Sequence, residues 1–243
     1  MNIIYEPAGR AKEYCELAVN LYRGCGHGCV YCYSPSTTRT ERSEFYGNPE
    51  PRKDIIAQLE KDCGRESGDG RKVLLSFTSD PYQPVNDRHG LTRQAIVLLK
   101  RVGYNVVILT KGGRRAEQDF DLLTGTDYAG ATLTFLNDAD SLEWEPGAAL
   151  PGERLAMLRE AKRQGIGTWV SLEPVIDPEQ ALEIIRRTHE YVDLYKVGTL
   201  NYHQRAAKID WRRFVAEVVA ALRGFGCKYY IKQDLRKYLV KTA

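Results

Sequence analysis

The segment NLYRGCGHGCVYCYSPS, from Asn20 to Ser36, holds three of the chain's six cysteines within eight residues. Cys25, Cys29 and Cys32 follow a C-x3-C-x2-C spacing, and glycines lie before and between them. Thiolates are the usual ligands of iron–sulfur clusters, and glycine lets a loop wrap tightly around a bound group. Three cysteines in one loop can hold three irons of a cubane and leave the fourth iron open to a small molecule. The segment therefore predicts a [4Fe–4S] cluster on Cys25, Cys29 and Cys32.

A zinc site with His27 as fourth ligand, in a binding module without catalysis, is the alternative for this loop. Structural zinc usually pairs two knuckles across a longer gap, and the sequence has no second knuckle. A disulfide framework is not expected, because the other cysteines (Cys15, Cys63 and Cys227) are scattered and a long cytosolic chain keeps its thiols reduced. The clustering of the three cysteines favours iron and sulfide.

Composition places the chain among ordinary globular proteins, since 43% of its 243 residues are hydrophobic and 28% are charged. We expect a single domain over residues 1–243. The net charge of +3 is too small to indicate a nucleic-acid partner by itself. No apolar run approaches the roughly 18 residues of a membrane helix, and the first residues lack a signal-peptide pattern. We therefore expect a cytoplasmic protein with no membrane partner.

Outward from the cysteine loop, short β-like runs alternate with amphipathic helical patterns. This alternation predicts a parallel sheet with right-handed crossovers, in either a doubly wound or a barrel arrangement. In both arrangements the chemistry lies at the carboxyl ends of the strands, and the cysteine loop follows the first strand. The expected strands are Glu16–Asn20, Lys72–Thr78, Asn105–Thr110, Ala131–Leu136, Gly167–Glu173, Val192–Gly198 and Lys228–Lys232. The expected helices are Arg52–Asp62, Pro151–Arg163, Pro178–His189 and the periodic stretches around Ala95–Val102 and Trp211–Leu222.

With an aromatic residue, Tyr31, before its last cysteine, the loop resembles the signature of the radical S-adenosylmethionine (SAM) superfamily. The sequence FTSDPYQPV after the second strand and ILTKG after the third resemble the branch that contains spore photoproduct lyase. The resemblance covers roughly Leu17 to Val175. It implies an α/β fold, a partial (β/α)6 TIM-type barrel, with its core over about residues 15–200. A short C-terminal extension of one helix and one strand would occupy residues 205–243.

The same resemblance implies an enzyme, lyase-like or related, in which the [4Fe–4S] cluster cleaves SAM reductively. The resulting 5′-deoxyadenosyl radical abstracts hydrogen from a substrate. An external one-electron reductant of the flavodoxin or ferredoxin type would supply the electron. The branch points to a nucleotide, nucleobase or nucleic acid as substrate, and a small metabolite or peptide is the alternative.

Site residues follow from the same match. Tyr31 would lie against the adenine, Val197 and Gly198 would line the adenine pocket, and Thr134 and Ser171 would contact the ribose or the SAM carboxylate. The residues expected to hold the methionyl amine follow the second strand: Ser76, Thr78, Ser79 and Asp80.

Glu173 and Lys196 are ionisable residues near strand ends, and we expect them to form a buried pair in the active site. The second strand carries Phe77 and no cysteine, although the lyase needs a cysteine hydrogen donor there. Repair of spore photoproduct is therefore not expected of this chain.

Overall fold

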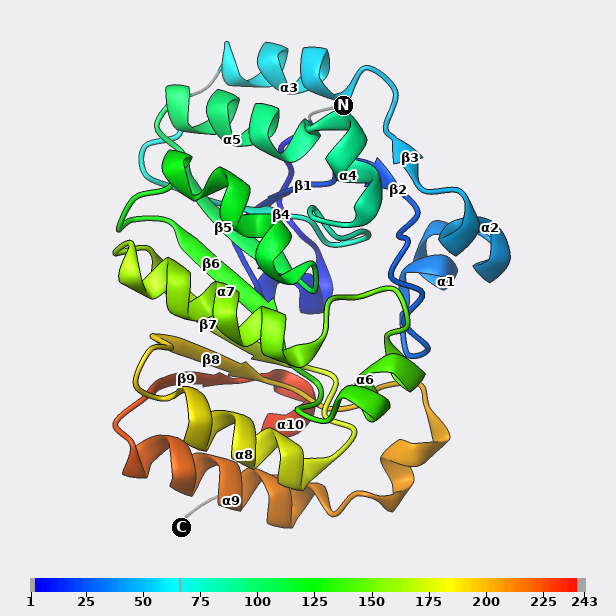
Figure 1. The fold of residues 1–243 in the computed structure, drawn as a ribbon, viewed down its shortest axis with the longest axis vertical. Helices are drawn as coiled ribbons and strands as arrows, with labels where there is room; N and C mark the ends of the chain where they lie inside the picture. Colours follow the sequence, from blue (N-terminus) through cyan, green and yellow to red (C-terminus); the bar gives the residue numbers. More distant parts are fainter. Residues whose placement is uncertain (1–2, 66, 240–243) are drawn as a thin grey trace.

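The computed structural model describes residues 3–65 and 67–239, in which seven parallel strands form one sheet (Figure 1). Neighbours in the sheet are also successive in the chain, so every crossover leads to the next strand. A doubly wound sheet would reverse its order, and this one does not, so the fold is a barrel. β1 and β9 are its two edges, and the barrel is therefore partial, as the sequence predicts. The strands are β1 (Leu17–Val19), β4 (Lys72–Leu75), β5 (Asn105–Thr110), β6 (Tyr128–Thr132), β7 (Gly167–Leu172), β8 (Leu194–Val197) and β9 (Lys228–Ile231).

Helices cover the outer face of the sheet. The buried side chains on this outer face and those on the inner face form two separate clusters. On β7, Val170 and Leu172 join the large cluster under the helices, whereas Trp169 fills the barrel interior with Ala18 and Leu74. The α-helices are α1 (Ser34–Thr38), α2 (Arg42–Gly47), α3 (Ile55–Cys63), α4 (Pro84–His89), α5 (Leu91–Arg101), α6 (Asp138–Trp144), α7 (Pro151–Arg163), α8 (Pro178–Thr188), α9 (Trp211–Gly224) and α10 (Gln233–Arg236). Shorter 3-10 segments are η1 (Gly9–Glu13), η2 (Gly113–Leu122) and η3 (Gln204–Lys208).

The fourth predicted strand, Ala131–Leu136, is misplaced, because β6 starts and ends earlier, at Tyr128 and Thr132. The prediction followed the apolar letters of ATLTFL, whereas the true strand contains the small residues Ala129-Gly130-Ala131. Gly130 lies against the indole of Trp169, because a Cβ there would be 2.1 Å from Trp169 Nε1. Ala129 and Ala131 face the other side of the sheet, in the core under the helices. Thr134 consequently lies beyond the strand.

The other predicted elements are present, with boundary differences. The Arg52–Asp62 helix begins only at Ile55, since Glu50–Pro51 pair as β3 with β2 (Tyr22–Arg23) in an antiparallel hairpin. The C-terminal extension contains α9, β9 and α10, and β9 continues the sheet by parallel pairing with β8. None of the helices in the described ranges is long and apolar enough to cross a membrane.

Candidate active site

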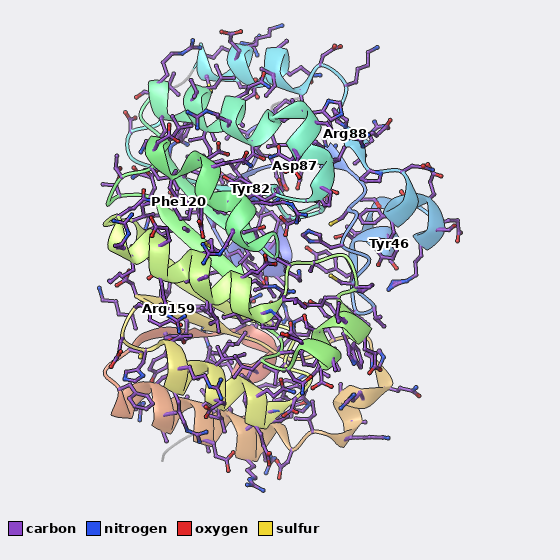
Figure 2. All side chains as sticks on the ribbon, in the orientation of Figure 1. Tyr46, Tyr82, Asp87, Arg88, Phe120 and Arg159 are labelled. Carbon is purple, nitrogen blue, oxygen red and sulfur yellow. The ribbon has the colours of Figure 1, made fainter. Side chains whose placement is uncertain are left out.

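The chain leaves the barrel after β1 through β2 and returns through β3, and the cysteine loop lies between these two short strands, followed by α1 and α2, which form a small lobe (Figure 1). Gly24 has φ 72°, and a Cβ there would meet the Phe45 carbonyl oxygen at 2.5 Å, so only glycine fits. That carbonyl accepts a 3.0 Å hydrogen bond from Cys25 N. Tyr46, on the lobe (Figure 2), donates to the carbonyl oxygen of Cys29 at 3.0 Å. The lobe thus fixes the path of the loop through its backbone.

Two segments from the barrel hold the other side of the loop. The amide of Gln83 donates to Gly24 O at 3.2 Å and accepts from Gly26 N at 2.8 Å. Gly147 N donates to His27 O at 2.9 Å, and a Cβ at Gly147 would lie 2.3 Å from Gly26 O. Hydrogen bonds from the barrel side therefore fix the backbone of the loop at Gly24, Gly26 and His27.

The three cysteines are free thiols, with Cys29 buried and Cys25 and Cys32 half-buried. Burial raises the pKa of Cys25 well above its ordinary range and that of Cys29 to about 12. Metal binding must therefore displace protons from these thiols. Among residues 3–65 and 67–239, no group of three or more His, Cys, Asp or Glu converges on a single-ion position.

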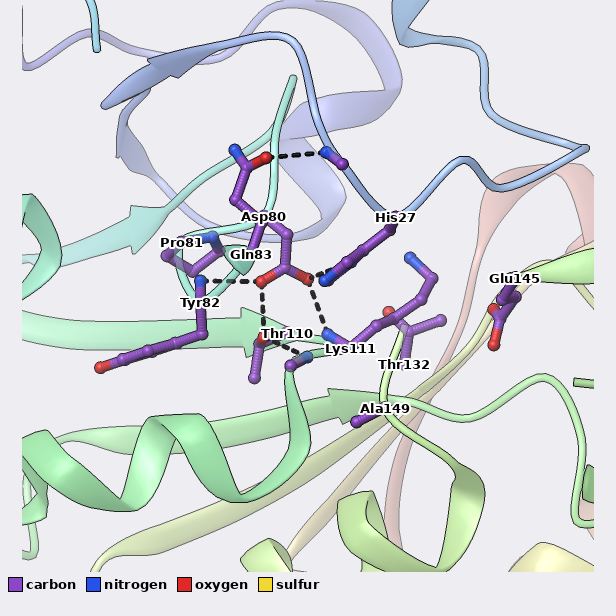
Figure 3. A network of polar contacts seen from close by, with 12 residues as sticks. His27, Asp80, Pro81, Tyr82, Gln83, Thr110, Lys111, Thr132, Glu145 and Ala149 are labelled. Atoms are coloured by element: carbon purple, nitrogen blue, oxygen red, sulfur yellow. Dashed lines mark hydrogen bonds and ion pairs between the residues drawn. The ribbon is translucent and has the colours of Figure 1, made fainter. Parts of the chain in front are cut away.

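Asp80 joins the ends of β4 and β5 to the cysteine loop (Figure 3). Its Oδ1 accepts from Tyr82 N at 2.9 Å and from Thr110 Oγ1 at 2.5 Å, and its Oδ2 accepts from Lys111 N at 2.7 Å. His27 Nδ1 lies 3.4 Å from the same Oδ2. The carboxylate therefore accepts three hydrogen bonds from the chain itself, which tie the end of β5 to the segment after β4. Its expected role toward the SAM amine stays a prediction.

Replacing Asp80 by alanine is expected to destabilise the fold, because two backbone N–H groups and one buried hydroxyl lose their acceptor. Each buried group left unsatisfied costs about 1–3 kcal/mol. Urea denaturation measures the loss, and Asp80→Asn, which keeps one carbonyl oxygen, should lose less than Asp80→Ala. Equal stability of wild type and Asp80→Ala would contradict this structural role.

Three hydroxyls after β4 have no hydrogen-bond partner within the described residues: Ser76 Oγ, Thr78 Oγ1 and Ser79 Oγ. Lys111, which follows the end of β5, lies at the same end of the barrel (Figure 3). Its Nζ donates no hydrogen bond within the described residues. Burial lowers the pKa of Lys111, but the negative charges of Cys29, Glu145 and Asp80 outweigh burial and leave the pKa above its ordinary value. An ammonium and three unsatisfied hydroxyls beside thiols suit a zwitterion, with a carboxylate and an amine, as ligand.

The sequence reading missed Lys111, although it lies within the quoted ILTKG motif. The available signal was its place two residues after Leu109, the last apolar residue of the expected strand Asn105–Thr110. Side chains at the carboxyl end of a barrel strand face the active site. A second missed group is the buried ion pair of Glu145 and Arg154, with side chains 0% and 1% exposed.

Tyr31 and Thr134 meet at this ion pair. The hydroxyl of Tyr31 donates to Glu145 Oε1, and Thr134 Oγ1 donates to the same oxygen at 3.3 Å. Arg154 forms an ion pair with Glu145, in which Nη2 and Oε2 are 2.6 Å apart. It also donates a 3.0 Å hydrogen bond to the carbonyl oxygen of Thr132, at the end of β6. Thr134 therefore supports Tyr31 in this structure, and the phenol of Tyr31 is held against the barrel.

The predicted pairing of Glu173 with Lys196 does not form. Glu173 binds Lys232 and the hydroxyl of Tyr14, while Lys196 Nζ donates to the carbonyl oxygens of Glu13 at 2.8 Å and Tyr14 at 2.6 Å. Burial lowers the pKa of Lys196 to about 8. Lys232 was not expected as the partner of Glu173, because it lies in the extension, outside the expected core.

Ser171 is buried on the interior face of β7, beside Tyr14, as its alternation predicts. Val197 points to the opposite face and packs in the core under the helices, so its side chain does not line the interior. Gly198 lies against Glu173, since a Cβ there would be 2.3 Å from Glu173 Oε1. Glycine at this position thus leaves room for the carboxylate.

A comparison with family models matches residues 19–193 to the radical SAM superfamily, which is most of the chain. The chain belongs to the radical SAM superfamily. This radical SAM protein is therefore an enzyme by family, and the superfamily implies SAM and an iron–sulfur cluster as its cofactors. The conserved fold accounts for the partial barrel and for the position of the cysteine loop after β1.

Two curated relatives and one solved structure illustrate the similarity. An uncharacterized protein of Mycobacterium tuberculosis is 28% identical over 171 residues, covering 65% of this chain and 49% of the relative. The radical SAM Nalpha-GlyT isomerase of Pseudomonas phage M6 is 27% identical over 154 residues, covering 63% of this chain and 31% of the isomerase. The chain spans about half the length of the first of these, and less of the second.

A mutant spore photoproduct lyase with bound SAM and dinucleoside spore photoproduct superimposes with a TM-score of 0.70 at 16% identity. The match covers 93% of this chain and 78% of the lyase. At this identity the likeness establishes the fold alone.

Proposed function

We propose that this protein holds a [4Fe–4S] cluster on Cys25, Cys29 and Cys32 and binds SAM beside it. The observation that carries the proposal is the set of unsatisfied hydroxyls of Ser76, Thr78 and Ser79, together with Lys111, at the same strand ends as the free thiols. Buried polar groups cost free energy unless a bound molecule satisfies them. A methionyl amine and carboxylate have the complementary groups.

Each part of the site has a role in this proposal. Three thiolates hold three irons, the hydroxyls accept from the amine of SAM, and the Lys111 ammonium pairs with its carboxylate. Tyr31, fixed by Glu145, forms an aromatic wall for the adenine, and Gly198 and the backbone of Val197 form the opposite wall. When bound, the cluster and SAM supply a carbon-centred radical that removes a hydrogen atom from a substrate.

The substrate class we propose is a nucleotide or nucleobase. Spore photoproduct lyase, whose fold this chain shares, is seen with a dinucleoside photoproduct, and the phage relative is named an isomerase of Nalpha-GlyT. An external one-electron carrier of the flavodoxin or ferredoxin type would reduce the cluster. We place the reaction in the cytoplasm, where such carriers and reduced thiols occur.

Anaerobic reconstitution with iron and sulfide tests the proposal. The protein is expected to take up iron and sulfide at the ratio of one [4Fe–4S] cluster per chain. After reduction with dithionite it should convert SAM to methionine and 5′-deoxyadenosine, slowly without substrate and faster with a suitable nucleotide. Zinc uptake in place of iron would contradict the cluster, and a reducible cluster that leaves SAM intact would contradict the SAM site.

A further inference from the structure

The N-terminal segment closes the open side of the barrel. Tyr5 pairs with Ala18 on β1, one edge of the sheet. Farther along, the Glu13 carboxylate accepts from the Tyr230 hydroxyl on β9 at 3.0 Å and from Gln233 N, at the start of α10, at 2.7 Å. The segment therefore spans from β1 to β9 and back, between two edges that do not pair with each other.

This crossing inserts Tyr14 into the barrel. Its ring makes edge-on contacts with Phe77, centroids 5.7 Å apart, and with Trp169 at 6.3 Å. Lys232 Nζ lies 3.5 Å from the ring centroid, and the phenol donates to Glu173. Phe77, Glu173 and Lys232 each follow the end of a different strand, so the Tyr14 phenol reaches the catalytic end of the barrel.

Packing alone does not explain these polar groups. Phenylalanine would keep the ring contacts with Phe77 and Trp169. A buried ion pair such as Glu173–Lys232 contributes little net stability compared with apolar side chains of the same volume. The phenol is held with a carboxylate acceptor and an ammonium beside it, and burial together with the Glu173 charge raises its pKa well above 10. Tyr14 therefore stays a neutral phenol with an intact O–H bond.

The geometry assigns Tyr14 the role of hydrogen-atom donor to the substrate-derived radical, an assignment that rests on the proposed radical reaction. The phenolic O–H bond breaks and a C–H bond forms on the substrate, which leaves a neutral phenoxyl on Tyr14. One electron from the external one-electron reductant and one proton from solvent then restore the phenol. Glu173 and Lys232 are positioning residues that orient the hydroxyl.

A phenol is chemically suited to this step, because its O–H bond is weaker than an alkyl C–H bond. The O–H bonds of serine and threonine and the N–H bonds of lysine are stronger than that C–H bond, so the neighbouring hydroxyls and ammoniums cannot substitute. Cys15, the next residue in the chain, is also in the barrel interior, but its thiol contacts the Lys72 carbonyl oxygen at 3.2 Å, at the opposite end of the strands.

The experiment uses the reconstituted, reduced protein with SAM in D2O and without substrate. Without substrate, the 5′-deoxyadenosyl radical is the carbon radical that Tyr14 meets, and it stands in for the substrate-derived radical. Only a phenol or a thiol can deliver solvent deuterium to it, so wild type is expected to yield deuterated 5′-deoxyadenosine. Freeze-quenched samples should show the electron paramagnetic resonance signal of a tyrosyl radical. Tyr14→Phe, which keeps the ring contacts, should lose both the deuterium and the signal.

Tyr33→Phe and Cys15→Ala are the matched controls. Tyr33 is a second phenol at the end of β4, where its hydroxyl donates to the Phe77 carbonyl oxygen at 3.3 Å, and both variants should retain the label. Loss of the label in either control, with Tyr14→Phe still labelled, would overturn the assignment and leave the radical reaction standing. Wild type that forms no 5′-deoxyadenosine would overturn the proposed function and this assignment together.

Discussion

Alanine at any one of Cys25, Cys29 and Cys32 is expected to abolish stable cluster binding. The loop provides one thiolate for each of three irons, so removing one would expose a second iron to solvent. Reconstituted variants should hold little iron and sulfide, lack the signal of a reduced [4Fe–4S] cluster and produce no 5′-deoxyadenosine. The backbone contacts from Gln83 and Gly147 do not involve the thiols, so the fold should persist by circular dichroism.

Cys227→Ser is the control for these variants, because this half-buried thiol lies between α9 and β9. It should take up iron and sulfide like wild type. Full cluster content in all three single variants of the loop would refute the assignment of Cys25, Cys29 and Cys32 as ligands.

Arg154→Met is expected to cause a large loss of stability, because it leaves the Glu145 charge buried without its ion-pair partner. Removing one partner of a buried ion pair costs about 3–5 kcal/mol. The free energy of unfolding in urea measures the effect in the protein without cofactor. The loss should extend to the carbonyl oxygens of Thr132 and Ala149, which accept hydrogen bonds from Arg154.

The double variant Glu145→Gln/Arg154→Met separates charge from packing. It removes both charges and keeps an oxygen that can accept from Tyr31, so it should recover much of the stability lost in Arg154→Met. If the double variant is as unstable as the single one, the uncompensated charge is not the cause.

Local patterns in the sequence were enough for most strands of the sheet and for the radical SAM signature. Strand and helix periodicity depends on neighbours a few residues apart, and the C-x3-C-x2-C spacing places its thiols in one loop whatever the fold. The exception among the strands is β6, whose Gly130 reflects a contact with Trp169, 39 positions later in the chain. The pattern of residues within one strand does not show which side chain of the neighbouring strand packs against it.

The tertiary structure decided the order of the strands and the partners of the polar residues. Barrel and doubly wound sheets share the same β/α alternation, and only the strand order separates them. Nothing near Asp80 in the sequence shows that Thr110 Oγ1 and Lys111 N donate to its carboxylate. Glu173 meets Tyr14 and Lys232, which lie 159 and 59 positions away in the chain, rather than the nearer Lys196. Hydrogen bonds between such distant residues form only after the barrel brings strand ends together, so no local pattern in the sequence specifies them.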